Sequence, residues 1–216
     1  MHADTFLSQR RQVKPLQFPV PKPAVHATLA VHGMILAFNK PYGILSQFTK
    51  EAPHHRTLAE FGFPPGVYPV GRLDADSEGL LLMTNNGDII NRMMRAANKH
   101  EKEYKVTVDK PVTDEFLKEM AGGVPILDTV TRPCQVEKLG KYKFKIILTQ
   151  GLNRQIRRMC EALGYEVKEL RRVRIMNIEL GNLKPGEYRK VTDQELNELY
   201  ELIRDSKSEP TPWNNN

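Results

Sequence analysis

The chain is poor in cysteine, in metal-ligand clusters and in long hydrophobic runs, and each shortage excludes a class of protein. Its 216 residues include only two cysteines, Cys134 and Cys160. Two cysteines outside a Cys-x-x-Cys pair make neither a disulfide framework nor a zinc site, so we expect both to be small core residues. No apolar run approaches the length of a membrane span or of a signal peptide, which favours a cytoplasmic protein.

The charge balance indicates an anionic partner. The net charge is +6 and the pI is near 9.3, and nucleic acid is the commonest partner of a basic soluble protein. Composition by itself leaves RNA, DNA and an acidic protein open. Hydrophobic residues make up 40% and charged residues 27% of the chain, as in ordinary globular domains. The chain contains no nucleotide-binding fingerprint and no cluster of metal-ligating residues.

The two ends differ in composition from the middle. Residues 1–32 hold four prolines and four Lys or Arg against a single acid, without apolar periodicity. Such a segment is expected to be disordered, either as a passive tail or as a basic RNA-binding arm. Residues 33–205 are expected to form one folded domain, and residues 206–216 a polar tail.

The middle of the chain mixes strands and helices. Alternating or continuous apolar runs predict strands at 34–38, 80–84, 101–108, 143–149, 165–170 and 173–178. Helical spacing and capping signals predict helices at 57–61, 88–98, 113–121, 153–164 and 192–203. Because the strands and helices do not alternate regularly, the pattern favours an α+β fold with a largely antiparallel sheet flanked by helices.

The sequence also predicts helix caps and one apolar helix face within these elements. Asp88 is the expected N-cap of the helix at 88–98, in which Met93 and Met94 fall on the core face. Thr192 and Glu195 have the spacing of a capping box at the start of the last helix.

The most distinctive stretch is 71–87, where three acids precede a buried strand. Asp74, Asp76 and Glu78 fall within five residues, bracketed by glycines that permit tight turns. Three interpretations are open. The acids are solvated loop residues, they begin a calcium loop, or one carboxylate is a nucleophile or electrostatic stabiliser kept ionised by Arg72. A calcium loop starting at Asp74 would need a glutamate at its twelfth position, where this chain has an asparagine.

A second distinctive stretch is the amphipathic helix at 153–164. Asn153 is its expected N-cap and Gly164 its expected end. Its first turn carries Arg154, Arg157 and Arg158, although positive charge opposes the helix dipole there. The three arginines are either solvated or placed to meet an anionic partner.

These stretches together resemble a known family. The motifs that carry the resemblance are Asn39-Lys40-Pro41-x-Gly43, Gly71-Arg72-Leu73-Asp74-x-x-Ser77-x-Gly79-Leu80, Thr84-Asn85-x-Gly87, Lys102-x-Tyr104 and Gly151-x-x-Arg154-Gln155-Ile156-Arg157-Arg158-Met159. They are similar to signatures of the ribosomal RNA pseudouridine synthases of the RsuA/RluB/RluE/RluF group. Residues 101–108, 124–127 and 151–160 are most like the RluF type. The opening motif and the absence of room for an S4 domain in front are more like the RluE type.

The resemblance implies a site as well as a fold, the pseudouridine synthase catalytic fold without an S4 domain. It implies that Asp74 is the catalytic residue, that Tyr104 lies against the target base and that Arg157 pairs with Asp74. Asp76 and Glu78 are then loop structure, and Lys40 is interpreted as a surface lysine. The residues expected to contact RNA are Arg72, Leu73, Arg154, Gln155, Ile156 and Arg158.

The function implied is the isomerisation of a specific uridine to pseudouridine, in large-subunit (23S) ribosomal RNA and with tRNA as a further candidate substrate. No cofactor or metal is needed, and we expect a monomer that does not bind membranes. The alternative from another class is a non-catalytic RNA-binding or ribosome-assembly protein that uses the same basic face.

Overall fold

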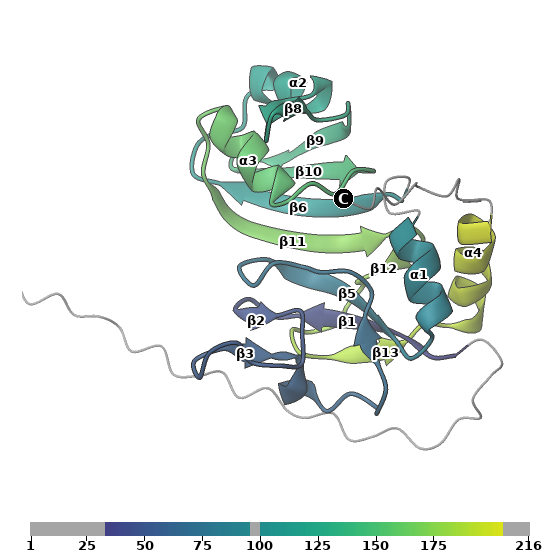
Figure 1. Ribbon diagram of the computed structural model, residues 1–216. Helices are drawn as coiled ribbons and strands as arrows, with labels where there is room; N and C mark the ends of the chain where they lie inside the picture. Colours follow the sequence, from purple (N-terminus) through teal and green to yellow (C-terminus); the bar gives the residue numbers. More distant parts are fainter. Residues whose placement is uncertain (1–32, 96–99, 205–216) are drawn as a thin grey trace, which may run out of the picture.

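A computed structural model describes residues 33–95 and 100–204 (Figure 1). The predicted extension at 1–32 and tail at 206–216 lie outside the described residues, as do positions 96–98 of the second predicted helix. The described residues form a mixed α and β structure with a largely antiparallel sheet, which confirms the predicted fold class.

The main sheet has nine strands, with the path β13-β1-β5-β11-β6-β10-β9; β4 pairs with β5 and β12 with β11. Its strands are β1 (Ile35–Lys40), β4 (Tyr68–Pro69), β5 (Glu78–Thr84), β6 (Lys102–Val108), β9 (Gln135–Gly140), β10 (Lys143–Leu148), β11 (Val167–Ile175), β12 (Ile178–Glu179) and β13 (Tyr188–Lys190). Within this sheet the described pairings are antiparallel except that of β5 with β11. Two small sheets pair β2 (Ile44–Leu45) with β3 (Arg56–Thr57), and β7 (Pro125–Ile126) with β8 (Thr129–Val130).

Helices cover the two halves of the sheet separately. The helical segments are α1 (Gly87–Arg95), α2 (Asp114–Gly122), α3 (Gln155–Ala162), α4 (Asp193–Arg204) and the 3₁₀ helix η1 (Leu58–Phe61). Figure 1 shows α2 and α3 beside β6, β9 and β10, and α1 and α4 beside the other half. No helix in the described ranges is both long and apolar enough to cross a membrane.

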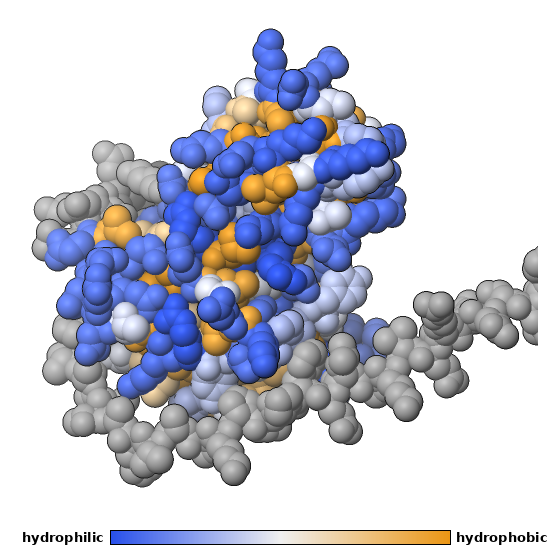
Figure 2. Space-filling view, turned by 180° about the vertical axis from the view of Figure 1, so that it is seen from behind, coloured by the Kyte–Doolittle hydropathy of each residue, from blue (hydrophilic) through white to orange (hydrophobic). Residues whose placement is uncertain are grey.

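The apolar cores follow this division. One core joins α2 and α3 to β6 and β10, and a second joins α1 and α4 to β1 and β5. A third packs η1 and Leu73 against β1 and β5. Cys160 is fully buried in the first, and Cys134 packs against it, so both are free core thiols as predicted. Seen from behind, the surface is covered mainly by hydrophilic side chains with small hydrophobic patches between them (Figure 2).

Two predicted helix N-caps are wrong, by two residues and by one. The side chain of Asn86, not Asp88, accepts the backbone N–H groups that begin α1, and Asp88 instead pairs with Arg92 at 2.9 Å. Arg154, not Asn153, is the N-cap residue of α3, in a left-handed conformation with φ 50°. Met93 is buried as predicted, whereas Met94 is half exposed because it lies at the edge of the helix's apolar face.

The largest correction concerns the region after α3. The sequence predicts two strands interrupted by Arg171 and Arg172, but β11 runs without a break through both arginines. Its alternation explains how: Arg171 turns outward to Glu78 at 2.7 Å, while Arg172 turns inward and is 4% exposed. The Nε of Arg172 donates to the carbonyl of Leu80 at 2.7 Å, so a charged side chain is accommodated inside the sheet.

The parallel junction of β5 and β11 depends on a glycine. Gly79 is the register partner of Arg172 and has φ +105°, a conformation that other residues rarely adopt. A Cβ at this position would collide with the carbonyl oxygen of Arg172 and lie 2.9 Å from its nitrogen. The glycine of the acidic motif therefore lets β11 approach the acidic loop.

Replacing this glycine tests the junction. We expect Gly79→Ala to lower the free energy of unfolding by about 3 kcal/mol, because the new methyl group meets backbone rather than a movable side chain. Gly87→Ala is the matched control, since a Cβ there meets nothing within 4 Å, and it should change stability by less than about 0.5 kcal/mol. Urea denaturation measures both, and equal effects would contradict the argument.

The predicted capping box of the last helix is present. The backbone N–H of Thr192 donates to Glu195 Oε2 at 2.8 Å, and that of Glu195 donates to Thr192 Oγ1 at 3.2 Å. Arg189 of β13 adds two hydrogen bonds of 2.8 Å to the same carboxylate. These bonds, those from Arg189 first, lower the pKa of Glu195 to about 2.

The cap gives a stability difference that depends on pH. A carboxyl whose pKa falls on folding, here from 4.5 to about 2, stabilises the fold above pH 4.5, and the effect is lost as pH falls towards 2. Glu195→Gln should therefore cost about 2 kcal/mol at pH 7 and almost nothing near pH 2. Denaturation of both proteins across this range gives the difference, and a difference that stays constant with pH would contradict this assignment.

Candidate active site

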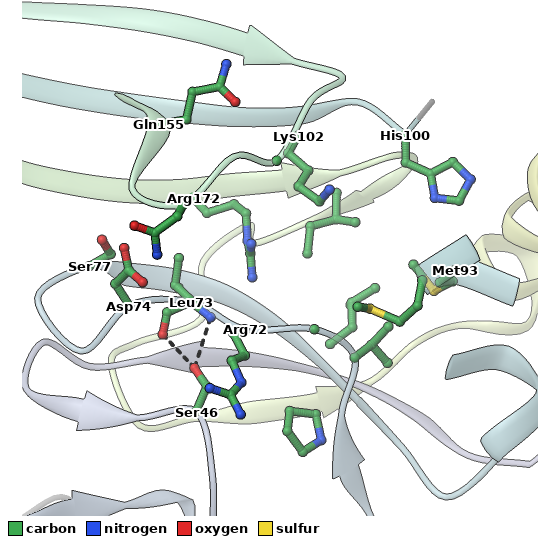
Figure 3. Close-up of a pocket in the computed structure, with 18 of the residues that line it drawn as sticks. Ser46, Arg72, Leu73, Asp74, Ser77, Met93, His100, Lys102, Gln155 and Arg172 are labelled. Carbon is green, nitrogen blue, oxygen red and sulfur yellow. Dashed lines mark hydrogen bonds between the residues drawn. The ribbon is translucent and has the colours of Figure 1, made fainter. Parts of the chain in front are cut away.

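A cavity of about 950 Å³ lies where the two halves of the sheet meet. Its lining comes from β5, β6, β10 and β11, from α1, from the loop that leads into α3 and from the acidic loop before β5. Figure 3 shows Asp74 and Ser77 on one side of this space, with Arg172 and Lys102 extending towards it from the strands. Segments far apart in sequence thus share one site.

The acidic loop is held firmly at its centre. Leu73 is 7% exposed and packs in the core below the loop. Its backbone N–H donates to Ser46 Oγ at 3.0 Å, and that hydroxyl donates to the Leu73 carbonyl at 2.6 Å (Figure 3). The N–H of Ser77 closes a turn on the carbonyl of Asp74 at 3.0 Å. Asp74 therefore sits on an anchored turn, with its side chain 41% exposed towards the cavity.

Two arginines from the start of α3 bind this loop, but not in the predicted way. Arg154 makes hydrogen bonds of 3.0 and 2.7 Å to the carboxylate of Asp76, and its Nη1 lies 3.5 Å from Asp74 Oδ2. Arg157 donates to the carbonyl of Asp76 at 2.7 Å and to the hydroxyl of Ser77 at 3.4 Å. The hydrogen bonds from Arg154 are the main reason that the pKa of Asp76 is lowered.

The structure therefore places Arg154, and not Arg157 as expected, beside the carboxylate of Asp74. Among the described residues, Arg154 is the one whose guanidinium lies within 4 Å of the Asp74 carboxylate. Arg154 has a left-handed backbone conformation, so its backbone departs from the regular geometry of α3. Arg157, already inside the helix, reaches the backbone of the same loop and holds it in place.

The same contacts count against the calcium interpretation. The carboxylate of Asp76 is taken by Arg154 and that of Glu78 by Arg171 at 2.7 Å. Carboxylates bound to arginine are poor ligands for a hard cation, which needs several free oxygens. The described ranges contain no group of three or more His, Cys, Asp or Glu residues placed to hold a metal.

The floor of the cavity is formed by side chains from the strands. Tyr104 of β6 is partly buried and lines the same cavity as Asp74. Arg172 is its register partner on β11, and Lys102 lies two residues earlier on β6. The sequence patterns assign no role in the site to Lys102 or Arg172. The alternation along a continuous β11 is the signal that turns Arg172 inward, and two separate predicted strands conceal it.

The residues predicted to contact RNA are placed very differently from one another. Arg72 and Arg154 are exposed at the cavity, whereas Leu73, Gln155 and Ile156 line it but are at most 7% exposed. Arg158 bonds to Asn153 and is not part of the lining. The buried members of this set position the acidic loop and the start of α3.

Lys40 is not the surface lysine that the sequence indicates. It is fully buried, and its Nζ donates to the carbonyls of Pro41 at 3.0 Å and Ile44 at 2.7 Å. Burial lowers its pKa to about 8. With these two hydrogen bonds, Lys40 fixes the turn that follows β1, behind the acidic loop. In this turn the backbone N–H of Gly43 donates to the carbonyl of Ala75, a residue of the acidic loop, at 2.6 Å.

The balance of charge in the cavity suits an anionic ligand. Four lining residues are Arg or Lys, namely Arg72, Lys102, Arg154 and Arg172, and the acidic lining residue is Asp74. Excess positive charge in a concave site attracts a polyanion such as RNA. A single carboxylate at the centre of that charge is suited to act on an electron-poor carbon.

Comparisons with known proteins agree with the motifs. Residues 34–162 match the family described as RNA pseudouridylate synthase. The chain is 53% identical to the "Dual-specificity RNA pseudouridine synthase RluF" of Escherichia coli strain K12, over 83% of this chain and 61% of that protein. It is 39% identical to the "Ribosomal large subunit pseudouridine synthase E" of Xanthomonas campestris, over 72% of this chain and 94% of that protein.

A solved structure, described as a pseudouridylate synthase, has the same fold. It is 31% identical, superposes with a TM-score of 0.71, and the match covers 77% of this chain and 74% of that one. The chain spans 61% of the length of the RluF relatives that it matches. Sequence motifs, fold and cavity thus agree, and the chain belongs to the RNA pseudouridylate synthase family.

Proposed function

We propose that this protein is an RNA pseudouridine synthase that isomerises a specific uridine of large-subunit (23S) ribosomal RNA. The observation that carries the proposal is the position of Asp74. Its carboxylate faces a cavity that also holds Tyr104 and four cationic side chains. Described residues of a single chain line this cavity, and we propose that the protein acts as a monomer, in the cytoplasm and without a cofactor.

The reaction breaks the bond between ribose C1′ and uracil N1, turns the base, and joins C5 to C1′. As the first bond breaks, C1′ becomes electron-poor, and a carboxylate either attacks it or stabilises it, as in glycoside cleavage. We assign this role to Asp74, oriented by Arg154 on one side and by the turn to Ser77 on the other. Arg157 then acts as a positioning residue for the loop.

Tyr104 is assigned to the base. Its ring lines the cavity from the strand floor, where it would pack on the uracil. We also assign to its hydroxyl a role in removing the C5 proton after the new bond has formed. Because a base inside a helix does not reach a pocket, the uridine must flip out, at a cost of roughly a few kcal/mol. Arg72, exposed beside Asp74, is placed to fill the gap or to hold a neighbouring phosphate.

The choice of RNA rests on the relatives. One is named for the ribosomal large subunit, and others are named for dual specificity, which motivates a second RNA class as substrate. We propose tRNA as that second class. The competing function is a non-catalytic RNA-binding or ribosome-assembly protein, for which the carboxylate of Asp74 would be dispensable.

Removing one charge tests the proposal. Asp74→Asn should lower pseudouridine formation by about 10³-fold or more while RNA affinity stays close to that of the wild type, because only the reacting carboxylate is lost. Glu78→Gln is the matched control: it removes a nearby acid that is absent from the cavity lining, and it should retain most activity. The assay maps new pseudouridines in ribosomal RNA and tRNA from cells that lack this protein.

Three results would contradict the proposal in different ways. Turnover by Asp74→Asn at the wild-type rate would refute the assignment of the carboxylate. Binding of ribosomal RNA without any new pseudouridine from the wild-type protein would favour the assembly function. Activity lost with a chelator and restored by calcium would revive the calcium interpretation.

A further inference from the structure

Two cations on the floor of the cavity have no role in the mechanism above. Arg172 is 4% exposed, and its Nε is occupied by the carbonyl of Leu80. Its Nη2 is buried and has no hydrogen-bond partner in the described ranges. Buried donors are almost always paired in folded proteins, so an unpaired one that borders a cavity indicates a missing acceptor.

The second cation lies on the neighbouring strand. Lys102 and Tyr104 are two residues apart on β6 and so face the same side of the sheet, and Arg172 is the direct register partner of Tyr104. Figure 3 shows the Lys102 and Arg172 side chains extending into the same space. Within the described part of the chain, no hydrogen bond is made by Lys102 Nζ, which leaves this ammonium group available to a ligand.

The two cations disfavour each other when the cavity holds no ligand. Burial and then the charge of Arg172 lower the pKa of Lys102 to about 8. Among the described residues, the cation within 4 Å of the acidic lining residue, Asp74, is Arg154 rather than Lys102 or Arg172. A ligand with electron-rich oxygens would therefore be drawn to the space in front of Lys102 and Arg172.

We propose that Arg172 and Lys102 bind the two carbonyl oxygens of the target uracil and stabilise the negative charge that it carries after it leaves C1′. This inference rests on the proposed function. When the bond from C1′ to N1 breaks, its electron pair stays with the base, and the charge spreads over N1, O2 and O4. Donors already aimed at those oxygens stabilise this state without reorganising.

The geometry of the base supports a pair of donors rather than one. A half-turn of uracil about the axis through N3 and C6 exchanges N1 with C5 and O2 with O4. Two cations that face the two carbonyls before the turn therefore face two carbonyls after it. An electron pair of C5 then forms the bond to C1′, and a carboxylate that has attacked C1′ leaves with the electron pair of its own bond. The C5 proton leaves, N1 takes up a proton, and the composition of the RNA is unchanged.

The same two cations are less suited to a backbone phosphate. They lie on the strand floor beside Tyr104 and are partly or fully buried, whereas Arg72 and Arg154 are exposed at the rim. A phosphodiester remains part of a continuous solvated strand, so its contacts belong at the rim. The flipped base is the part of the substrate that enters the cavity.

Lys102→Met tests the assignment because it removes the charge and keeps the length of the side chain. With saturating RNA, single-turnover conversion should fall by about 10²-fold while RNA affinity changes little. Lys105→Met is the matched control: Lys105 lies on the opposite face of the same strand, is exposed and is absent from the cavity lining. Arg172→Lys, which retains charge but loses the forked donor, should slow conversion by about tenfold.

A second measurement identifies the group that Lys102 contacts. In target RNA with 2-thiouridine or 4-thiouridine at the reacting position, sulfur accepts hydrogen bonds weakly and delocalises negative charge by itself. The deficit of Lys102→Met relative to the wild type should therefore shrink on both thio RNAs. Because the half-turn exchanges O2 and O4, sulfur at either position should reduce the deficit.

The outcomes separate this inference from the proposed function. A deficit of the same size on uridine and thio RNAs would overturn the contact with the carbonyls. Unchanged conversion with weaker, less salt-dependent RNA binding by Lys102→Met would make Lys102 a phosphate contact instead. If the wild-type protein converts no uridine in any RNA, the proposed function itself fails, whereas a Lys102→Met rate equal to that of Lys105→Met refutes only the present inference.

Discussion

The parallel pairing of β5 with β11 is the constraint on which the site depends. It brings Arg172 against Gly79, five residues after Asp74, and Tyr104 lies on the next strand in register with Arg172. The sheet is otherwise antiparallel, so this pairing joins two halves that each have their own apolar core. The cavity exists because the halves meet at a junction where one strand carries a glycine and the other an inward arginine.

The three acids of the central loop illustrate how neighbouring carboxylates acquire different surroundings. Asp76 is bound by two arginines of the α3 start, and Glu78 by Arg171 on the outer side of β11. Asp74 has a single arginine at 3.5 Å and keeps 41% of its side chain exposed towards the cavity. Two of the acids are therefore occupied by arginines, which leaves the third exposed to meet a substrate. Sequence spacing treats the three alike, whereas the surroundings separate them.

The cations of the site divide in a similar manner. Lys40 is buried and donates hydrogen bonds to two backbone carbonyls, so it supports the turn behind the loop. Arg72 and Arg154 are exposed at the rim, where RNA phosphates arrive. Lys102 and Arg172 lie deeper, on the strands beside Tyr104. The cations thus fall into three groups according to their burial: one that supports the fold, two at the rim of the cavity and two on its floor. All of them contribute to the positive net charge of the chain.

Sequence by itself determined the family resemblance, the α+β class, the free core cysteines and the cap of α4, because these depend on local spacing and residue type. It also located the stretch that carries Asp74. Only the tertiary structure decided that Arg154 rather than Arg157 reaches Asp74, across 80 positions of the chain. It likewise decided that Arg171 and Arg172 continue a strand, since the Leu80 carbonyl that accepts from Arg172 lies 92 positions away. Such contacts are set by the pairing of strands that lie far apart in the sequence, and local sequence patterns contain no information about that pairing.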